Sequence, residues 1–490
     1  MDSTFAALLA RMQELKDLSG VIGLATWDQE TYLPRKAEEA RGEQLSTLQG
    51  LYHERLVDPR LGELLSNATP GDADQRAMML RLSEERDRQL KVPGRLVREL
   101  AQVQSQGLAA WKRAREAKDT RLFFPVLARL LELRREQADA LGHDGERYDA
   151  LLEAYEPGMR VARLMPVLEA LAAKLTPMVA AVTARPPPAD PFAGKTFDPE
   201  AQWRFTMGLL PALGFDLEAG RQDRSVHPFT GGTHPFDVRL TTRINPATPL
   251  PAIFGTIHEA GHGLYEQGFA PPHHRTPLAA APSMGLHESQ SRLWENVVGR
   301  SRGFWSHFYP SLQRAFPAEL GSTSLDVFVG AVNRVERSLI RVEADELTYN
   351  LHIVLRTQLE LSLLRGQLEV KDLEAAWNEK SRVLLGRTPA HPAEGVLQDI
   401  HWSSGELGYF PTYALGNLYA ASLFAAARRQ LPGLEDAIAR GELSVLREWL
   451  REKVHAQGYR LRAEELVTQV TGRGLTDEDF LASMRARHQL

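Results

Sequence analysis

The sequence predicts a mainly α-helical protein with one small β-sheet. Through residues 1–180, apolar side chains recur at every third or fourth position, which is the pattern of a helix face, and no stretch alternates for long. A second long helical pattern covers residues 326–364. Strands are predicted within residues 224–243, because residues 237–243 alternate in polarity and are rich in β-branched side chains.

The N-terminal part is expected to be a run of helices. Apolar side chains at helical spacing mark the first one, at Phe5, Leu8, Leu9, Met12 and Leu15. Further helical patterns cover residues 36–55, 74–92, 95–117 and 121–142. Residues 185–194 contain three consecutive prolines, which cannot continue a helix. We therefore expect a single unit over residues 1–490, with this loop as a candidate boundary between two lobes, about 1–190 and 191–490.

Composition argues against several classes of protein. The formal net charge is −5, so no basic surface indicates nucleic-acid binding. No run of about 18 apolar residues predicts a membrane span. The chain has no cysteine, which excludes disulfides and a cysteine-type zinc site. The N-terminus lacks the basic start of a signal peptide, so we expect a cytoplasmic protein.

The pattern that carries chemistry is His258-Glu259-x-x-His262. On a helix the two histidines are one turn apart and share a face, so their imidazoles can hold one Zn²⁺. Glu259 follows the first histidine and can act as general base toward a water molecule on the metal. A catalytic zinc usually has three protein ligands. Glu288, in the next predicted helix, is the candidate for the third, and Glu295 is the alternative.

Three glycines surround this histidine pair, at positions 255, 261 and 263. Each costs about 1 kcal/mol relative to alanine in a helix interior, which suggests that something packs closely there, either a metal site or a bound chain. Gly268 is expected to end the helix.

The predicted strand at 237–243 precedes the metal-binding helix, and Gly231-Gly232 is expected to form the turn before it. Such a strand could offer its edge to an extended peptide. The alternative is a small sheet that only shapes a wall of the site.

Two further segments carry polar groups that suit a binding site. Within 326–364, Arg341, Asp345, Thr348 and His352 form one polar stripe at helical spacing, which favours a polar cavity over a solvated face. An intrahelical pair between Arg341 and Asp345 is the structural alternative. Residues 395–402 and 408–413 combine glycines and aromatics without periodicity, which is typical of a loop against a site. Tyrosine hydroxyls and an imidazole there could stabilise an oxyanion.

Together these motifs resemble the M32 family of metallocarboxypeptidases, the thermostable-carboxypeptidase type. The matching motifs are His227-Pro-Phe229, Asp237-x-Arg239-x-Thr241, His258-Glu-x-x-His262, His287-Glu-Ser-Gln290, Ile340-Arg-x-x-Ala-Asp345 and Gly395-x-x-Gln-Asp-x-His-Trp402. The resemblance implies a large helical fold similar to the gluzincins, with a small sheet and a deep substrate groove. It also implies a cytoplasmic homodimer that removes C-terminal amino acids from peptides with broad specificity. One divalent metal ion per subunit is implied, with zinc expected and cobalt as the alternative.

The resemblance also implies roles for individual residues. His258, His262 and Glu288 would hold the metal, and Glu259 would be the general base. His401 and Tyr413 would bind the oxyanion, with Tyr409 as the second tyrosine. Arg341 is the candidate for binding the terminal carboxylate of the substrate, because its guanidinium matches a carboxylate, and Arg239 is the alternative. Two other functions stay open, namely an endo-acting oligopeptidase with the same metal site and a non-catalytic peptide-binding protein.

Overall fold

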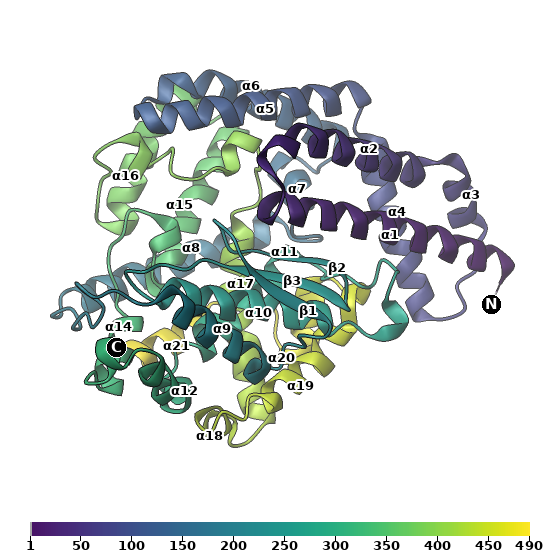
Figure 1. The fold of residues 1–490 in the computed structure, drawn as a ribbon. Coiled ribbons are helices and arrows are strands. Elements are labelled where there is room, and N and C mark those ends of the chain that lie inside the picture. Colours follow the sequence, from purple (N-terminus) through teal and green to yellow (C-terminus); the bar gives the residue numbers. More distant parts are fainter. Residues whose placement is uncertain (1) are drawn as a thin grey trace.

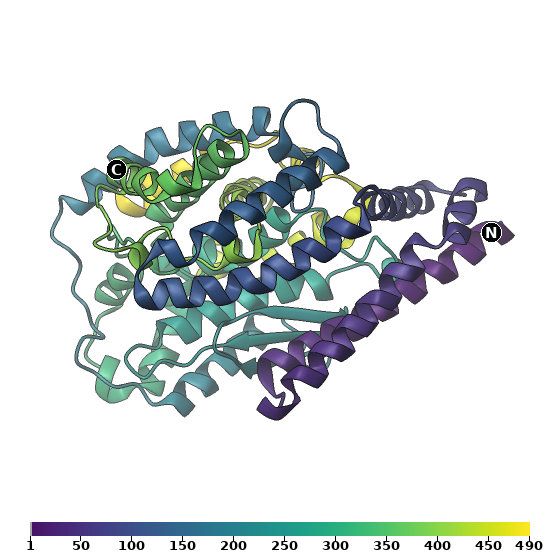
Figure 2. The same cartoon turned by 90° about the horizontal axis from the view of Figure 1, so that it is seen from above.

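The computed structural model describes residues 2–490 and confirms a mainly helical fold with one small sheet (Figure 1). The helices that precede the sheet are α1 (Ser3–Thr31), α2 (Glu38–Val57), α3 (Pro59–Asn67), α4 (Ala73–Lys91), α5 (Gly94–Ala117), α6 (Phe124–Leu141), α7 (Arg147–Leu152), α8 (Val161–Thr183) and α9 (Pro199–Leu213). The predicted periodic segments are found as α1, α2, α4, α5 and α6; α3, α7 and α8 also lie largely in the helical region expected over residues 1–180, and α9 was not predicted. Helices α5 and α6 run side by side across the top of the molecule (Figures 1 and 2).

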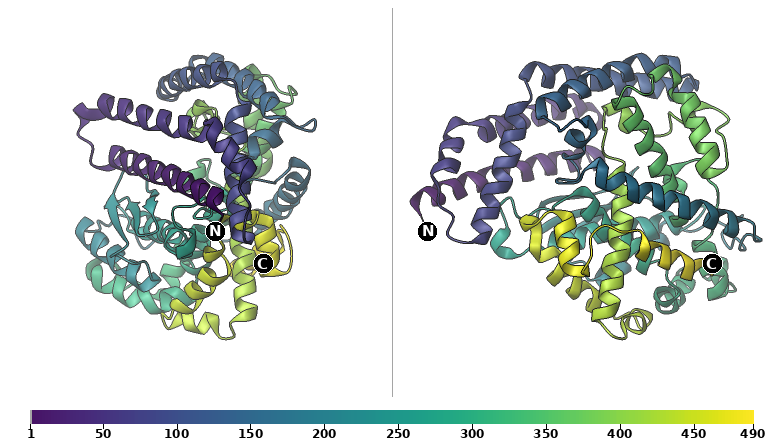
Figure 3. Two further views of the ribbon diagram at one scale, coloured as in Figure 1. Left: turned by 90° about the vertical axis from the view of Figure 1, so that its right-hand side faces the viewer. Right: turned by 180° about the vertical axis from the view of Figure 1, so that it is seen from behind.

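The sheet and the remaining helices make up the rest of the chain. The strands are β1 (Gly220–Arg224), β2 (Thr230–His234) and β3 (Asp237–Thr242). The later helices are α10 (Leu250–Gln267), α11 (Met284–Arg292), α12 (Arg302–Ala315), α13 (Pro317–Leu320), α14 (Leu325–Val332), α15 (Glu346–Leu364), α16 (Leu373–Leu385), α17 (Pro411–Gln430), α18 (Leu434–Ala439), α19 (Ser444–Lys453), α20 (Ala463–Thr471) and α21 (Glu478–His488). Helix α21 packs on the long core helix α17 (Figure 3).

The order of the strands corrects two expectations. The sheet has the order β1-β3-β2, with β1 parallel and β2 antiparallel to β3. The predicted strand β3 is therefore the central one and has no free edge to offer a peptide. Gly231 and Gly232 lie within β2, and the turn into β3 falls at residues 235–236.

Helix α1 lies along β2, as Figure 2 shows. A side chain at Gly20 would come within 2.8 Å of the Thr233 carbonyl oxygen, so the helix backbone approaches the strand directly. This contact covers part of the sheet edge, which otherwise would present unpaired backbone groups.

The glycines of α10 allow close packing, although no bound chain is needed to explain them. A methyl group on Gly261 would lie 2.6 Å from the Gln290 carbonyl oxygen and from the Ser291 Cα, both in the backbone of α11. One on Gly263 would lie 2.7 Å from the Phe215 ring. The prediction of close packing is confirmed, and for these two glycines the neighbours are α11 and the core. Gly268 ends α10 as predicted.

The helix predicted for residues 326–364 is broken in the structure. Helix α14 ends at Val332, and α15 begins only after Asp345, whose side chain accepts hydrogen bonds from the backbone N–H groups of Leu347 and Thr348. Asp345 is therefore an N-cap and not a helical partner of Arg341. The apolar spacing was misleading because Val342, which fits the pattern, is 74% exposed in the connecting loop.

Helix α8 is long and apolar enough, by length and composition, to span a membrane. In the fold, Leu164, Leu168, Leu171 and Leu175 are fully buried in the main hydrophobic core. Such burial is what a core helix of a folded domain requires.

We expect Gly261→Ala to weaken both folding and metal binding, because the added methyl group meets the rigid backbone of α11 and must separate the two helices that carry the site. The loss of stability should be about 1–3 kcal/mol. Gly255→Ala is the matched control on the same helix, since its nearest neighbour is the Thr242 hydroxyl at 3.4 Å. Thermal unfolding of both variants, with metal content measured alongside, separates them. A Gly261→Ala protein as stable and metal-loaded as Gly255→Ala would contradict this account.

Candidate active site

The two histidines of α10 and the acid of α11 meet at one point, as predicted. The Glu288 Oε2 atom lies 3.3 Å from His262 Nε2 and 3.7 Å from His258 Nε2. One donor atom from each of these residues lies within 4.8 Å of the others. Their side chains are 19%, 14% and 10% exposed for His258, His262 and Glu288, so the group is largely but not fully buried. Two imidazoles and one carboxylate form a donor set that fits a divalent cation with an open position.

Glu288 is held in its ionised form by its neighbours. Burial alone would raise the pKa of this carboxyl, but Arg292 and His258 hold the pKa well below its usual range. The Arg292 Nε–H donates to Glu288 Oε1 at 2.7 Å, and the Ser291 hydroxyl donates to Oε2 at 3.1 Å. Gly416 of α17 makes room for the side chain, since a methyl group there would lie 2.5 Å from Glu288 Cγ. An ionised, fixed carboxylate is what a metal ligand requires.

Glu295 lies behind the donor group and does not belong to it. It sits in a π-helical segment, Leu293–Val298, and its Oε2 is 2.8 Å from His258 Nδ1. This contact orients the imidazole so that Nε2 faces Glu288. His262 is instead stacked on His287, with ring centroids 4.5 Å apart, and His287 Nε2 lies 2.9 Å from Glu266 Oε1. His258 is thus oriented by a hydrogen-bonded acid outside the donor group, whereas His262 is held by ring stacking on His287.

Glu259 lies beside the first histidine and is almost fully buried. Burial raises the pKa of Glu259 above its usual value, against the opposing effects of His258 and Thr230. The Thr230 hydroxyl, from the edge strand β2, donates to Glu259 Oε2 at 2.6 Å. A carboxylate with a raised pKa next to a metal site is suited to accept and return a proton.

The predicted oxyanion residues also come together. His401, in a short 3₁₀ turn, places Nε2 3.2 Å from the hydroxyl of Tyr413 in the first turn of α17. The Tyr409 ring lies 5.3 Å from both the His401 ring and the Tyr413 ring. Burial lowers the pKa of His401 to about 4, so the imidazole is neutral near pH 7. Burial is the main cause that raises the pKa of Tyr409 and of Tyr413, and the negative charge of Glu288 adds to it. Both tyrosines therefore lie close enough to Glu288 to sense its charge.

Arg341 lies against this aromatic group but has a carboxylate partner from its own chain. Its Nε and Nη2 donate to Asp399 Oδ1 at 2.9 and 2.7 Å, and Nη1 donates to the Tyr349 hydroxyl at 2.9 Å. Arg356 binds the other oxygen of Asp399 at 2.6 Å. The guanidinium carbon of Arg341 lies 5.0 Å from the centre of the Tyr413 ring. Arg341 is therefore paired with Asp399 and not with Asp345, and its side chain lies beside the oxyanion residues.

Arg239 has a different environment. Its guanidinium donates to both oxygens of Asp237 at 2.8 and 3.1 Å and stacks over Trp27 of α1 at 4.5 Å. No hydrogen bond or ion pair within residues 2–490 joins it to the metal ligands.

The loop that carries His401 is attached to a buried acid, Glu360 of α15. The Trp402 indole N–H donates to Glu360 Oε1 at 2.8 Å, and the backbone N–H of Gly408 donates to Oε2 at 3.0 Å. The Tyr148 hydroxyl donates to Oε2 at 2.7 Å. Burial raises the pKa of Glu360 to about 7, and these three donors oppose that shift. The carboxylate thus fixes both sides of the segment between His401 and α17.

Sequence reasoning missed three residues that organise the site. Arg292 follows Glu288 by four positions on one helix, a spacing that could have indicated the pair. Asp399 stands inside the quoted loop motif, so its presence was noted without a role. Glu360 gave a weaker signal, an acid within the apolar pattern of α15.

Comparisons with known proteins point to one family. The model of the family described as carboxypeptidase Taq (M32) metallopeptidase matches residues 7–488. Thermostable carboxypeptidase 1 of Thermus thermophilus is 44% identical, over 99% of this chain and 98% of that protein. Carboxypeptidase 1 of Bacillus subtilis is 37% identical, over 95% and 94%. The crystal structure of the M32 carboxypeptidase from Deinococcus radiodurans R1 superposes with a TM-score of 0.97 at 38% identity, covering 99% of both chains. This agreement over nearly the whole length shows that the chain belongs to the M32 family and is a metallocarboxypeptidase.

Proposed function

We propose that this protein releases C-terminal amino acids from peptides by metal-assisted hydrolysis, with Glu259 as general base. The observation that carries the proposal is the convergence of His258, His262 and Glu288 on one point, with a buried carboxylate of raised pKa beside them. A divalent cation held there would polarise the scissile carbonyl and lower the pKa of a water molecule toward about 7.

The residues of the chain then divide the remaining work. Glu259 takes the proton of the attacking water and later gives it to the leaving amine. The hydrogen bond from Thr230 fixes the orientation of its carboxylate. The hydroxyl of Tyr413 and the imidazole of His401 are 3.2 Å apart and could donate together to the oxyanion, with Tyr409 beside them.

Selection for a free C-terminus needs a cationic group near the oxyanion residues. Arg341 is our proposal, because it lies 5.0 Å from the Tyr413 ring and is fixed by Asp399. A guanidinium that is already positioned loses little freedom when it binds a carboxylate. Arg239 is the alternative, although it lies against Trp27 and Asp237.

We further propose zinc as the metal, with cobalt as a substitute, since the donor set suits several divalent ions. From the motifs and composition we also propose broad specificity for peptide substrates and a homodimer. We further propose a location in the cytoplasm, without nucleic-acid or membrane partners.

Metal binding and proton transfer should be separable by two variants of neighbouring acids. Glu288→Gln removes a ligand, so we expect low metal content and lost activity. Glu259→Gln should keep the metal but lose about 10²–10⁴-fold in kcat, because the ligands remain and the base does not. Chelation should abolish wild-type activity, and Zn²⁺ or Co²⁺ should restore it. Metal analysis of the purified proteins, with peptide hydrolysis rates, checks both. Full metal occupancy in Glu288→Gln would mean that Glu288 is not a metal ligand.

The role of Arg341 should appear in the ratio of kcat/KM for a free-acid peptide to that for its C-terminal amide. This ratio does not depend on how much enzyme is folded, which matters because Arg341 is also bonded to Asp399. We expect Arg341→Lys to lower the ratio about tenfold or more, since a lysine keeps the charge but loses the two-pronged contact. Arg239→Lys is the matched control and should leave the ratio unchanged. A shift in the control alone would assign the carboxylate to Arg239. Equal cleavage of acid and amide by the wild type would favour an endo-acting oligopeptidase.

Glu360 should make stability depend on pH with a defined sign. The pKa of its carboxyl is about 7 in the folded protein against a usual value of 4.5, so between these values the folded state keeps a proton that the unfolded state releases. The associated stability is present at low pH and is lost as the pH rises through about 7. Glu360→Gln removes this dependence, so the stability gap between wild type and variant should narrow from about pH 4.5 to 7. Urea unfolding at several pH values measures the gap. A gap that stays constant from about pH 4.5 to 7 would mean that the three donors keep Glu360 ionised throughout this range.

A further inference from the structure

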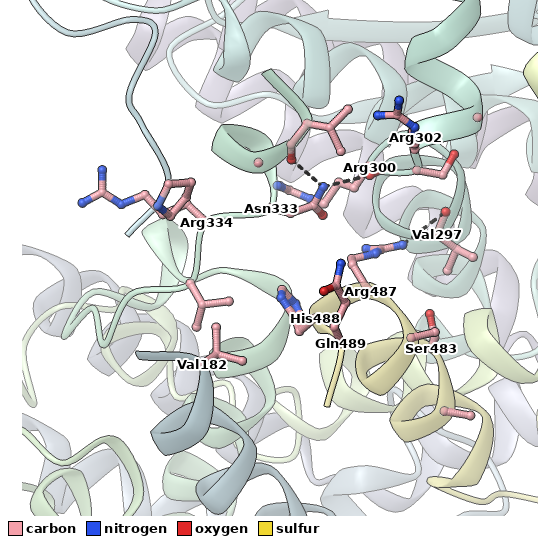
Figure 4. Close-up of a pocket in the computed structure, with 18 of the residues that line it drawn as sticks. Val182, Val297, Arg300, Arg302, Asn333, Arg334, Ser483, Arg487, His488 and Gln489 are labelled. Carbon is pink, nitrogen blue, oxygen red and sulfur yellow. Dashed lines mark hydrogen bonds between the residues drawn. The ribbon is translucent and has the colours of Figure 1, made fainter. Parts of the chain in front are cut away.

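A cavity of about 1260 Å³ lies apart from the active site (Figure 4). Its walls come from the end of α8 and the proline-rich loop, from residues 297–303, from residues 329–337 and from α21 at the C-terminus. None of the metal ligands, Glu259 or the oxyanion residues lines it.

The lining of this cavity carries an excess of positive charge. It includes seven arginines and four carboxylates. Each carboxylate already has an arginine partner, and these pairs are Asp326–Arg302, Glu336–Arg334, Glu435–Arg428 and Asp479–Arg473. The lining therefore holds four arginines that no acid of the cavity neutralises, Arg185, Arg300, Arg337 and Arg487.

Arg300 and Arg487 pair with Glu295 and Glu346, and the other two have no carboxylate partner anywhere in residues 2–490. Arg185 donates to the backbone carbonyls of His488 and Gln489 at 2.7 and 3.1 Å. Arg337 makes one side-chain hydrogen bond, from Nε to the Thr183 hydroxyl at 3.3 Å. Several of its N–H groups therefore remain available to an acceptor.

The pKa of His488 reflects this concentration of positive charge. Burial together with Arg487 and Arg185 lowers the pKa of His488 to about 4, as expected for an imidazole in a positive environment. His488, Arg487 and Gln489 lie close together on one wall of the cavity in Figure 4, opposite Asn333 and Arg300.

Arginines from both walls contact the π-helical segment Leu293–Val298, which carries Glu295. Arg300 donates through Nε to Asn296 Oδ1 at 2.9 Å and lies 3.8 Å from Glu295 Oε1. Arg487 donates to the Val297 carbonyl at 3.3 Å. Glu295, which directly precedes Asn296 and Val297 in this segment, holds His258 Nδ1 at 2.8 Å. An anion in the cavity would thus bind arginines that contact the π-helical segment.

We propose that this cavity binds a small organic molecule carrying phosphate groups. Guanidinium groups match phosphate oxygens in pairs, and surplus arginines in a recessed site provide the charge that such a ligand needs. The volume is large for a simple ion and suits a ligand with a carbon framework. Apolar side chains of the same lining, including Val182, Val329 and Phe424, could contact that framework. This inference is independent of the proposed catalytic mechanism.

Isothermal titration of the full-length metal-loaded enzyme tests the proposal, with fructose 1,6-bisphosphate as an organic probe and inorganic phosphate as the free anion. We expect saturable binding of the bisphosphate at one site per chain. The double variant Arg185→Gln/Arg337→Gln should bind the bisphosphate at least about tenfold more weakly than the wild type. Because Arg185 also holds the end of α21, Arg337→Gln alone is included, and it should weaken binding in the same direction.

The matched control is Arg121→Gln/Arg382→Gln, which removes two exposed arginines that pair with acids elsewhere. It loses the same charge and should bind like the wild type. Tight binding of inorganic phosphate alone would support the phosphate site and assign it to the free ion. The proposal is overturned if neither probe binds saturably, if binding survives in both cavity variants, or if the control loses as much affinity as they do.

Discussion

The active site depends on how closely the backbones of α10 and α11 approach each other. Gly261 stands between His258 and His262 in sequence and meets the backbone of Ser291, three residues after Glu288. No larger residue fits that contact, so the separation of the helices is fixed by the absence of a side chain. Gly416 acts differently on the other side, where it leaves room for the side chain of Glu288 against α17. The positions of the three side chains thus depend on a close backbone contact on one face of α11 and on space left for Glu288 on another.

Burying so many charges beside the metal ligands is costly unless each charge is paired. The chain meets this requirement with a continuous set of partners. Arg292 pairs with both Glu288 and Glu295, and Asp399 binds two arginines at once. Arg292 also stacks on Tyr349, whose hydroxyl accepts a bond from Arg341. The metal side and the arginine side of the site are therefore linked through shared partners, and a change at one side alters the electrostatics of the other.

Local patterns predicted the parts of the molecule that local chemistry decides. The helix of the two histidines, its end at Gly268, the acid on the next helix and strand β3 all follow from short-range spacing. The break before α15 was missed because the exposed Val342 continued the helical spacing of apolar residues. Asp345 is a typical N-cap residue and could have indicated a new helix start at that point. Strand order and the partners of Arg341 were missed for another reason. Asp399 lies 58 positions from Arg341 and Glu360 lies 212 from Tyr148, and one sequence gives no spacing rule over such distances.

The ion pair between Arg341 and Asp399 bears on how Arg341 could bind a substrate carboxylate. A buried guanidinium without a partner would have to be stabilised by the substrate, and the free site would be costly to maintain. Because Asp399 accepts hydrogen bonds from both Nε and Nη2 of Arg341, this side chain is held in place before a peptide binds. Arg356 also forms an ion pair with Asp399 and helps to neutralise its charge. Two arginines around one aspartate leave a net positive charge next to Tyr413 and His401. A terminal carboxylate would complete the balance of charge there, whereas an internal peptide bond would not, and this difference favours exopeptidase action over endo-acting cleavage.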